Sequence, residues 1–236
     1  WFPMMVGSDE KRFAWQDEGL TRFHQSLAMA DFFKGYDRFA QAMDRYAATV
    51  RNGLEVELMR HGDLYPIGSP AFVIASYEKP SLVLRALAGV LGEETFFRAL
   101  REYGRRWRDR HPTPFDFFNT FEDVAGRDLD WFWTPWFYET WTLDHALGPI
   151  TPAGGALEVV IEDRGLAPMP ARVVVTRADG STERHEVPVE VWLRGARRHV
   201  LRIPAEPAVT RIEIDPERWF PDIDRSNQVW VATTGG

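Results

Sequence analysis

The sequence predicts an α+β protein in which an all-helical region precedes a small antiparallel β-sandwich. Up to about Leu147, apolar residues recur at helical spacing. After Gly148-Pro149, apolar and polar residues alternate in short segments, as they do in half-buried strands. We therefore expect a helical domain at residues 1–148 and a β-sandwich domain at residues 149–236.

The expected helices each carry an apolar stripe at helical spacing. Gly92 is expected to end the third helix, and Thr113 followed by Pro114 is a typical start of the fifth. Residues 52–70 hold several Gly and Pro residues and are expected to form a loop. The expected helices span residues 13–33, 36–50, 82–91, 96–107, 114–125 and about 128–136.

The expected strands are short and bounded by turn residues. The dipeptide Asp179-Gly180 lies between two of them and is typical of a β-hairpin turn. No carboxylate pair or histidine cluster stands out in this region, so we expect it to be structural rather than catalytic. The expected strands span residues 157–161, 171–177, 182–189, 200–203 and 210–214.

Composition excludes several function classes. The formal charge of -7 argues against a nucleic-acid partner, because phosphate binding needs a cationic face. The sequence has no cysteine, which excludes disulfides and thiol chemistry. No apolar run approaches the roughly 20 residues of a membrane-spanning helix. We expect a soluble protein, and the composition leaves its compartment (cytoplasmic, periplasmic or secreted) and its oligomeric state open.

The histidines do not form a complete metal motif. None of the six lies four residues from another, so the chain has no metal-binding histidine pair on one helix face. The sequence also lacks a G-x-S-x-G elbow, a phosphate loop and a dinucleotide fingerprint. Composition and spacing alone therefore predict only a helical domain followed by a β module.

The stretch WQDEGLTRF at Trp15–Phe23, preceded by WFPMMVGS at Trp1–Ser8, resembles the M1 family of zinc aminopeptidases, which are gluzincins. In that family a helix with two zinc-binding histidines leads into a tryptophan-containing segment, and a second helix brings an Asn-Glu-Gly triplet whose glutamate is the third zinc ligand. Glu18 matches that glutamate. The family spacing places both histidines upstream of Trp1, so the resemblance implies a zinc site to which this chain contributes one ligand.

A second stretch, SYEKP at Ser76–Pro80, resembles the family's tyrosine-x-lysine-glycine segment. Tyr77 matches the tyrosine that donates a hydrogen bond to the tetrahedral oxyanion. A neutral donor aimed at the developing negative charge lowers the barrier more than it stabilises the bound substrate. The resemblance thus implies a catalytic role for Tyr77, and it makes its neighbour Glu78 a candidate for the cleft.

The chain departs from the family pattern at several positions. Asp17 replaces the usual asparagine, Pro80 replaces a glycine, and Pro3 stands where the family often has glycine. Gln25 occupies a position where relatives carry an acid that holds a zinc-bound histidine. Glutamine accepts the imidazole proton but supplies no charge, so Asp17 and Gln25 are candidates for tuning the zinc site. These departures indicate a divergent bacterial branch of the family.

His61 lies in the segment MRHGDLYP at Met59–Pro66, just ahead of the tyrosine motif. Two interpretations stay open for it. Its turn residues favour a surface loop, while its position near Tyr77 allows it to line the cleft.

The resemblance implies a parent enzyme that removes N-terminal residues from peptides by zinc-activated water, with its general base also upstream of Trp1. The chain by itself is then expected to be inactive. Two alternatives remain: a pseudoenzyme that binds peptides without cutting them, and a scaffold whose sandwich docks another protein. A contiguous apolar patch on residues 171–189 favours the scaffold, whereas an alternating polar outer face does not.

Overall fold

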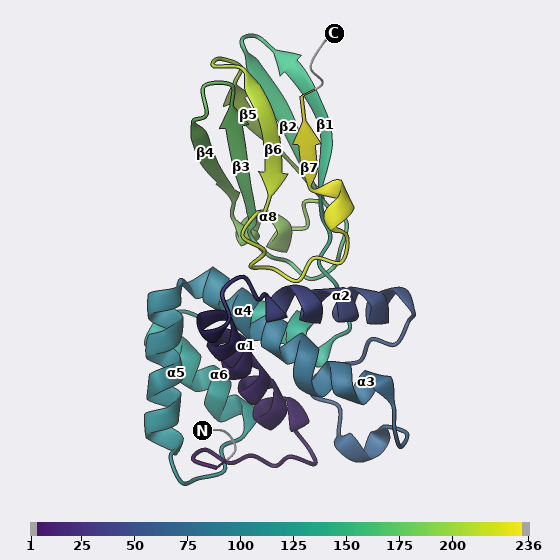
Figure 1. The fold of residues 1–236 in the computed structure, drawn as a ribbon, viewed down its shortest axis with the longest axis vertical. Coiled ribbons are helices and arrows are strands. Elements are labelled where there is room, and N and C mark those ends of the chain that lie inside the picture. Colours follow the sequence, from purple (N-terminus) through teal and green to yellow (C-terminus); the bar gives the residue numbers. More distant parts are fainter. Residues whose placement is uncertain (1–3, 233–236) are drawn as a thin grey trace. The chain divides into compact units, whose positions relative to one another are not determined.

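The computed structural model describes residues 4–232 and divides the chain into two units (Figure 1). The helical unit contains the described residues up to Thr140 and also Trp219–Pro221. The β unit contains Trp141–Arg218 and the described residues from Asp222 onward.

The helical unit consists of α-helices joined by loops and π-helical turns (Figure 1). The α-helices are α1 (Leu20–Phe32), α2 (Arg38–Arg51), α3 (Pro70–Val73), α4 (Lys79–Leu91), α5 (Glu93–Trp107), α6 (Pro114–Ala125) and α7 (Asp130–Trp133). The π-helical turns are η1 (Trp15–Gly19), η3 (Ile74–Glu78) and η4 (Thr134–Tyr138), and a 3-10 turn, η2, spans Gly62–Leu64. Within the described residues no helix is long and apolar enough to cross a membrane.

The helix ends follow the signals in the sequence. Thr113 forms a capping box with Asp116 at the start of α6, and Pro114 occupies the first turn. Gly92 and Gly126 end α4 and α6 at φ values of 78° and 67°, which glycine adopts without strain. Local chemistry therefore fixes these helix boundaries.

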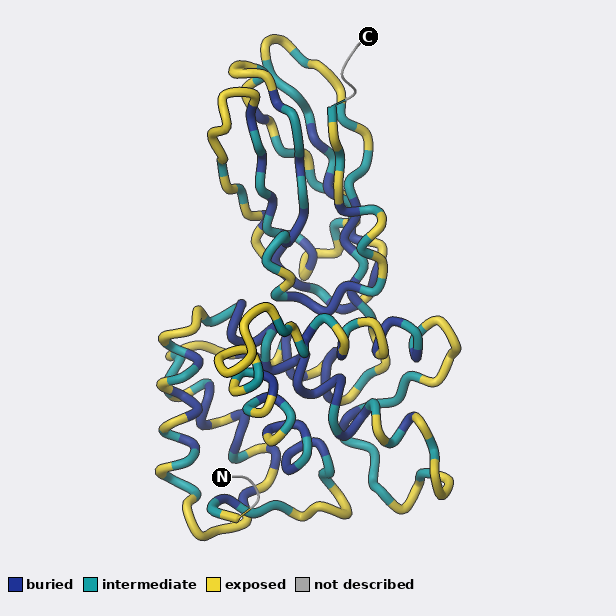
Figure 2. The backbone as a smooth tube through the Cα atoms, in the orientation of Figure 1, coloured by how far each residue is buried: buried dark blue, intermediate teal, exposed yellow. Residues whose placement is uncertain are grey.

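An aromatic cluster forms the core of the helical unit. The Trp15 ring packs 4.7 Å from Phe137 and 5.7 Å from Phe117, measured between ring centroids. Tyr103 packs edge-on against Phe117 at 5.1 Å. Such aromatic pairs contribute about 0.5–1.5 kcal/mol each beyond the area that they bury. Figure 2 shows that the inward faces of these helices are buried and the outer faces exposed.

The β unit contains two antiparallel sheets, of order β1-β2-β5 and β4-β3-β6-β7. One hydrophobic cluster includes Val159 and Ile161 from the first sheet and Val173 and Ile212 from the second. The elements are β1 (His145–Ala153), β2 (Ala156–Asp163), β3 (Ala171–Arg177), β4 (Thr182–Val187), α8 (Val189–Leu193), β5 (Arg198–Pro204), β6 (Val209–Ile214), η5 (Arg225–Asn227) and β7 (Val229–Val231). The predicted fold class, helices followed by antiparallel sheets, is confirmed.

Several predicted boundaries differ from the structure. Leu147 lies in β1 rather than in a helical region, and the expected boundary between residues 148 and 149 falls inside that strand. β1 contains Gly148, Pro149 and Pro152, which are uncommon inside strands and interrupt the alternation of apolar and polar residues. The strand is therefore not recognisable from that alternation. The strand expected at residues 182–189 ends at Val187, and Val189 begins α8.

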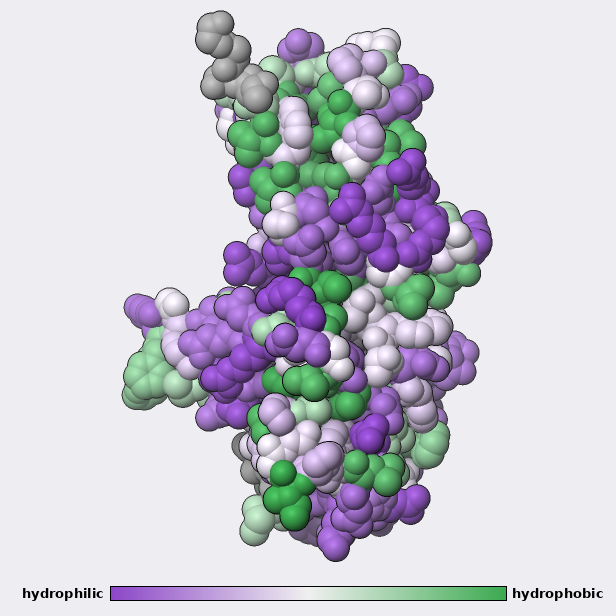
Figure 3. All heavy atoms as spheres, turned by 90° about the vertical axis from the view of Figure 1, so that its right-hand side faces the viewer, coloured by the Kyte–Doolittle hydropathy of each residue, from purple (hydrophilic) through white to green (hydrophobic). Residues whose placement is uncertain are grey.

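The surface is mixed in character. Figure 3 shows hydrophilic residues interspersed with hydrophobic ones over the face that it draws. This pattern is ordinary for the surface of a globular protein.

Candidate functional site

The two residues singled out from the sequence lie on π-helical turns. Glu18 belongs to η1 and Tyr77 belongs to η3. η1 continues directly into α1, and η3 continues directly into α4. A π-helical turn holds one more residue than an α-helical turn, and such turns frequently occur at functional sites.

The side chains next to Glu18 anchor η1 in the helical unit. Trp15 is 1% exposed and lies in the aromatic core. Gln16 is also buried, and its Nε2 donates to the Tyr103 hydroxyl at 2.8 Å and to the Pro112 carbonyl at 3.2 Å. Glu18 itself is only partly buried.

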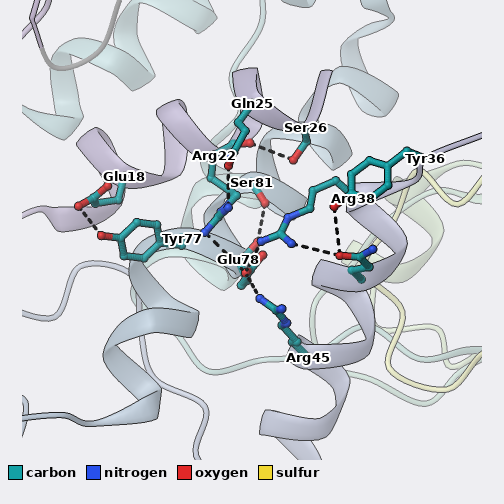
Figure 4. Close-up of polar contacts among 11 residues, drawn as sticks. Glu18, Arg22, Gln25, Ser26, Tyr36, Arg38, Arg45, Tyr77, Glu78 and Ser81 are labelled. Carbon is teal, nitrogen blue, oxygen red and sulfur yellow. Dashed lines mark hydrogen bonds and ion pairs between the residues drawn. The ribbon is translucent and has the colours of Figure 1, made fainter. Parts of the chain in front are cut away.

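Glu18 and Tyr77 meet in the structure although 59 residues separate them. The Tyr77 hydroxyl donates a hydrogen bond to Glu18 Oε1 at 2.5 Å. Figure 4 shows the two side chains directed toward each other from η1 and η3. The two motifs therefore contribute to one site in this chain.

Gly19 and Pro80 lie at the point where these two segments approach most closely. A Cβ atom added to Gly19 would lie 2.6 Å from Pro80 Cβ and 3.4 Å from the Ser76 carbonyl oxygen. A side chain at position 19 would therefore push the segments apart. The proline that departs from the family pattern fills the space that the glycine leaves open.

Burial and neighbouring carboxylates shift the proton affinities at this site. Burial, followed by the charges of Glu18 and Glu10, raises the pKa of Asp17 to about 6. Burial, followed by the hydrogen bond to Glu18, raises the pKa of Tyr77 to about 12. The Tyr77 hydroxyl consequently keeps its proton at neutral pH and acts as a hydrogen-bond donor.

Glu78, the residue after Tyr77, is 0% exposed and faces three arginines. Its Oε1 lies 2.8 Å from Arg45, 3.2 Å from Arg38 and 4.0 Å from Arg22, measured to guanidinium nitrogens. Arg22 belongs to α1, and the other two arginines belong to α2. Glu78 thus links η3 to two helices.

The remaining candidates lie in different surroundings. Gln25 is exposed, and its Oε1 accepts a hydrogen bond of 2.6 Å from Arg22 Nη1. His61 is partly buried, and its Nδ1 accepts from the backbone N–H of Asp63 at 3.1 Å, as the cap of η2. These contacts are those of a surface turn, the interpretation that the turn residues favour. Pro3 lies outside the described residues.

Within residues 4–232, Glu18 is not part of a group of three potential metal ligands. Such a group does occur at Glu122, Asp128 and Asp130. Two of its carboxylates already accept hydrogen bonds from N–H groups of the adjoining turn, which accounts for their position. Glu18 instead offers a single carboxylate, which fits a zinc ion whose other ligands come from elsewhere.

The sequence analysis did not single out the arginines around Glu78 or the Lys79–Glu55 pair. The Lys79 Nζ atom lies 2.5 Å from Glu55 Oε1, and both side chains are almost fully buried. A local signal existed for Arg22, because residues four apart share one helix face and Arg22 follows Glu18 by four. The pairing of Lys79 with Glu55 depends on tertiary packing and has no local signal.

Comparison with known families gives one match over more than half of the chain. Residues 1–136 match the sequence profile described as the peptidase family M1 domain. The match includes η1, η3 and all helices up to α7.

Curated relatives are similar over part of the chain. Aminopeptidase M1-D of Oryza sativa subsp. japonica is 25% identical over 143 residues, which are 58% of this chain and 16% of that protein. Putative aminopeptidase-2 of Caenorhabditis elegans is 35% identical over 79 residues, which are 33% of this chain and 4% of that protein. The chain therefore spans less than a fifth of the length of these relatives.

A solved structure shares the fold. The crystal structure of Legionella pneumophila aminopeptidase A in complex with aspartic acid aligns with a TM-score of 0.64 at 16% sequence identity. The alignment covers 92% of this chain and 24% of that chain. The likeness thus extends over helical and strand regions alike.

Proposed function

Because the chain belongs to peptidase family M1, we propose that its helical unit forms one part of the active site of a zinc-dependent aminopeptidase. The observation that carries the proposal is the hydrogen bond between Tyr77 and Glu18. Each residue matches a family motif of its own, and the fold brings the two side chains into contact. If either motif resembled the family only by chance, there would be no reason to expect the two side chains to be in contact.

Glu18 holds zinc through its carboxylate, and the other protein ligands come from the full-length protein. A glutamate beside two imidazoles is a common ligand set of catalytic zinc and leaves a position open for water. A zinc ion held there would supply Lewis-acid chemistry, lowering the pKa of the attacking water and polarising the scissile carbonyl. A single carboxylate holds zinc weakly, so the chain by itself is inactive.

Tyr77 donates its phenolic proton toward the oxygen that becomes negatively charged as the peptide bond is attacked. Its raised pKa keeps the donor neutral, and its hydroxyl lies within hydrogen-bond distance of the proposed ligand oxygen. A neutral donor held beside the zinc-binding carboxylate stabilises the transition state more than the substrate, because the negative charge on the substrate oxygen develops only in the transition state. The substrates are peptides, cleaved at their N-terminal residue.

The experiment compares the full-length protein with Glu18→Ala and Tyr77→Phe variants, and measures zinc per chain and hydrolysis of aminoacyl p-nitroanilides. Glu18→Ala is expected to lose both zinc and activity. Tyr77→Phe is expected to keep zinc and to lose about 100-fold or more in kcat, as removal of an oxyanion donor does. Glu94→Ala is the matched control, because the Glu94 side chain is 95% exposed on α5.

Two outcomes contradict the proposal. Full zinc occupancy in Glu18→Ala removes Glu18 from the ligand set. Binding of peptides and zinc by the full-length protein without any cleavage would contradict the proposal and support the pseudoenzyme alternative.

The scaffold alternative finds little support in the β unit. Buried and less buried positions alternate along β3, and exposed and half-buried positions alternate along most of β4 (Figure 2). The less buried positions of β3 are Arg172, Val174 and Thr176. These strands therefore lack the contiguous apolar patch that docking of another protein requires.

A further inference from the structure

Three contacts join the same two short segments of the chain, residues 18–22 and residues 76–80. The first is the hydrogen bond between Glu18 and Tyr77. The second is the close packing of Gly19 against Pro80. The third is the ion pair between Arg22 and Glu78 at 4.0 Å. The close packing fixes the separation of the segments, and the ion pair adds a link one helical turn beyond the hydrogen bond.

Tyr77 and Glu78 are adjacent residues whose side chains point to different partners. Figure 4 shows Tyr77 directed toward Glu18, and Glu78 directed toward the arginines. The Glu78 carboxylate is buried, and a buried carboxylate is stable only when its charge is paired. The three arginines therefore hold Glu78 firmly, and any rotation of η3 that moves Tyr77 also pulls Glu78 away from them.

Arg22 contacts both residues. Its guanidinium carbon lies 5.5 Å from the centre of the Tyr77 ring, within the range of a cation–π contact. Its Nη2 atom faces Glu78, and its Nη1 donates to Gln25 at 2.6 Å. Because Gln25 and Arg22 lie on the same helix, the guanidinium is held on α1 and presents a fixed surface to the Tyr77 ring.

A π-helical turn is an uncommon backbone form, found mostly as a single turn inserted in an α-helix. In η3 the ring of Tyr77 is only half buried, so core packing alone does not fix its orientation. Side-chain contacts of Arg22 and Glu78 supply the missing constraint.

We propose that Arg22 and Glu78 are positioning residues that hold the Tyr77 hydroxyl against Glu18. Arg38 and Arg45 act from α2 by keeping Glu78 in place. The effect on catalysis rests on the proposed peptidase function, whereas the effect on the Tyr77 side chain does not. The two parts are therefore tested by separate measurements.

The first measurement uses fluorine NMR on the chain labelled with 3-fluorotyrosine. The chain has six tyrosines, and the resonance of Tyr77 is identified by its absence in Tyr77→Phe. In Arg22→Met this resonance is expected to move toward the chemical shift of an exposed tyrosine. Arg22→Lys keeps a cation beside the ring and is expected to restore part of the shift.

Arg98→Met is the matched control, because Arg98 lies on α5 with a 52% exposed side chain and pairs with Glu94 instead of Glu78. The Tyr77 resonance is expected to stay near its wild-type position in this variant. An unchanged resonance in Arg22→Met overturns the proposal, and so does an equal change in Arg22→Met and Arg98→Met. If Arg22→Met does not fold, the comparison of Arg22→Lys with Arg98→Met decides the question.

The second measurement uses the full-length protein. Arg22→Met is expected to lower kcat by about tenfold or more, because a small displacement of a catalytic group has effects of that size. KM and zinc content are expected to stay close to the wild-type values, which a general loss of structure would not allow. An unchanged kcat overturns the catalytic part. A wild-type protein without peptidase activity refutes the proposed function, and the fluorine experiment still decides the positioning of Tyr77.

Discussion

The helical unit and the β unit bury their ionisable groups in different ways. In the helical unit, Glu78 and Lys79 are buried in consecutive positions and pair with Arg38 and Glu55 on other segments. These pairs connect elements that are 40 and 24 residues apart in the sequence, with Tyr77 immediately beside them. The buried charges of this unit therefore converge on the candidate site.

In the β unit, buried carboxylates serve mainly the ends of strands and the loops. Asp163 at the end of β2 pairs with Arg197 at 3.0 Å, and Asp215 just after β6 pairs with Arg225 at 3.0 Å. Asp222 accepts hydrogen bonds from backbone N–H groups. Similar side chains thus hold the segments of the candidate site in one unit and stabilise strand ends and loops in the other. The predictions that follow test this difference, beginning with the largest expected effect.

Lys79→Met leaves Glu55 buried without its partner. Loss of one member of a buried ion pair destabilises a protein by about 3–5 kcal/mol. Hydrogen exchange measured by mass spectrometry is expected to show faster exchange throughout the helical unit and unchanged exchange in β2, β3 and β6. The double variant Lys79→Met/Glu55→Leu removes both charges and is expected to recover most of the protection. Equal acceleration in both units would contradict the assignment of this pair to the helical unit.

The stability of the β unit is expected to depend on pH through Asp222. Burial raises the pKa of this carboxyl to about 7, although it accepts N–H groups of His145 and Asp224 and lies near Arg225. Between about pH 4 and pH 7 the folded protein keeps a proton that the unfolded chain has lost. The contribution of Asp222 to the free energy of unfolding therefore falls as pH rises through this range, by about 2–4 kcal/mol, and is constant above it.

The measurement for Asp222 is urea unfolding of the wild type and of Asp222→Asn at pH 5 and pH 8. The difference between the two proteins isolates this group from the other acids of the unit, such as Glu183, whose pKa is lowered by its hydrogen bond from Arg177. The free energy of unfolding of the wild type, relative to that of the variant, is expected to be larger at pH 5 than at pH 8. A difference that does not vary with pH would show that Asp222 ionises normally in the folded protein.

The degree to which the sequence predicted the molecule also differs between the units. The capping box at Thr113 and the glycine ends of α4 and α6 were predictable, because each depends on residues close together in the sequence. The Asp179-Gly180 turn was predictable for the same reason, and Gly180 has a φ of 83°. β1 was missed because its glycine and prolines break the alternation.

The candidate site was predicted through family motifs and not through local patterns. Glu18 and Tyr77 are ordinary helix residues by periodicity, and their contact arises only when η1 and η3 pack together. The spacing of apolar residues along the sequence does not indicate that either turn is π-helical. The arginines around Glu78 come from two helices, and a sequence pattern does not show which faces of those helices will meet.

Gly19→Ala tests whether the segments of the site depend on close approach. The added Cβ would lie 2.6 Å from Pro80 Cβ, so one segment must move. Overpacking of this kind destabilises by about 1–3 kcal/mol. The fluorine resonance of Tyr77 is expected to shift, and Gly19→Ala/Pro80→Gly is expected to reverse part of the shift. A wild-type resonance and wild-type stability in Gly19→Ala would show that the crossing tolerates a methyl group.

Gly104→Ala is expected to have the smallest effect and the opposite sign. Gly104 lies within α5, and a Cβ atom added there meets no atom within 4 Å. Alanine loses less conformational freedom than glycine on forming a helix, so the substitution is expected to stabilise by about 0.5–1 kcal/mol. Thermal unfolding should show a higher Tm with an unchanged Tyr77 resonance. A stabilised Gly104→Ala beside a destabilised Gly19→Ala would locate the strain at the crossing of η1 and η3. If both variants are destabilised alike, the loss reflects a general intolerance of these helices to substitution, and the crossing has no special role.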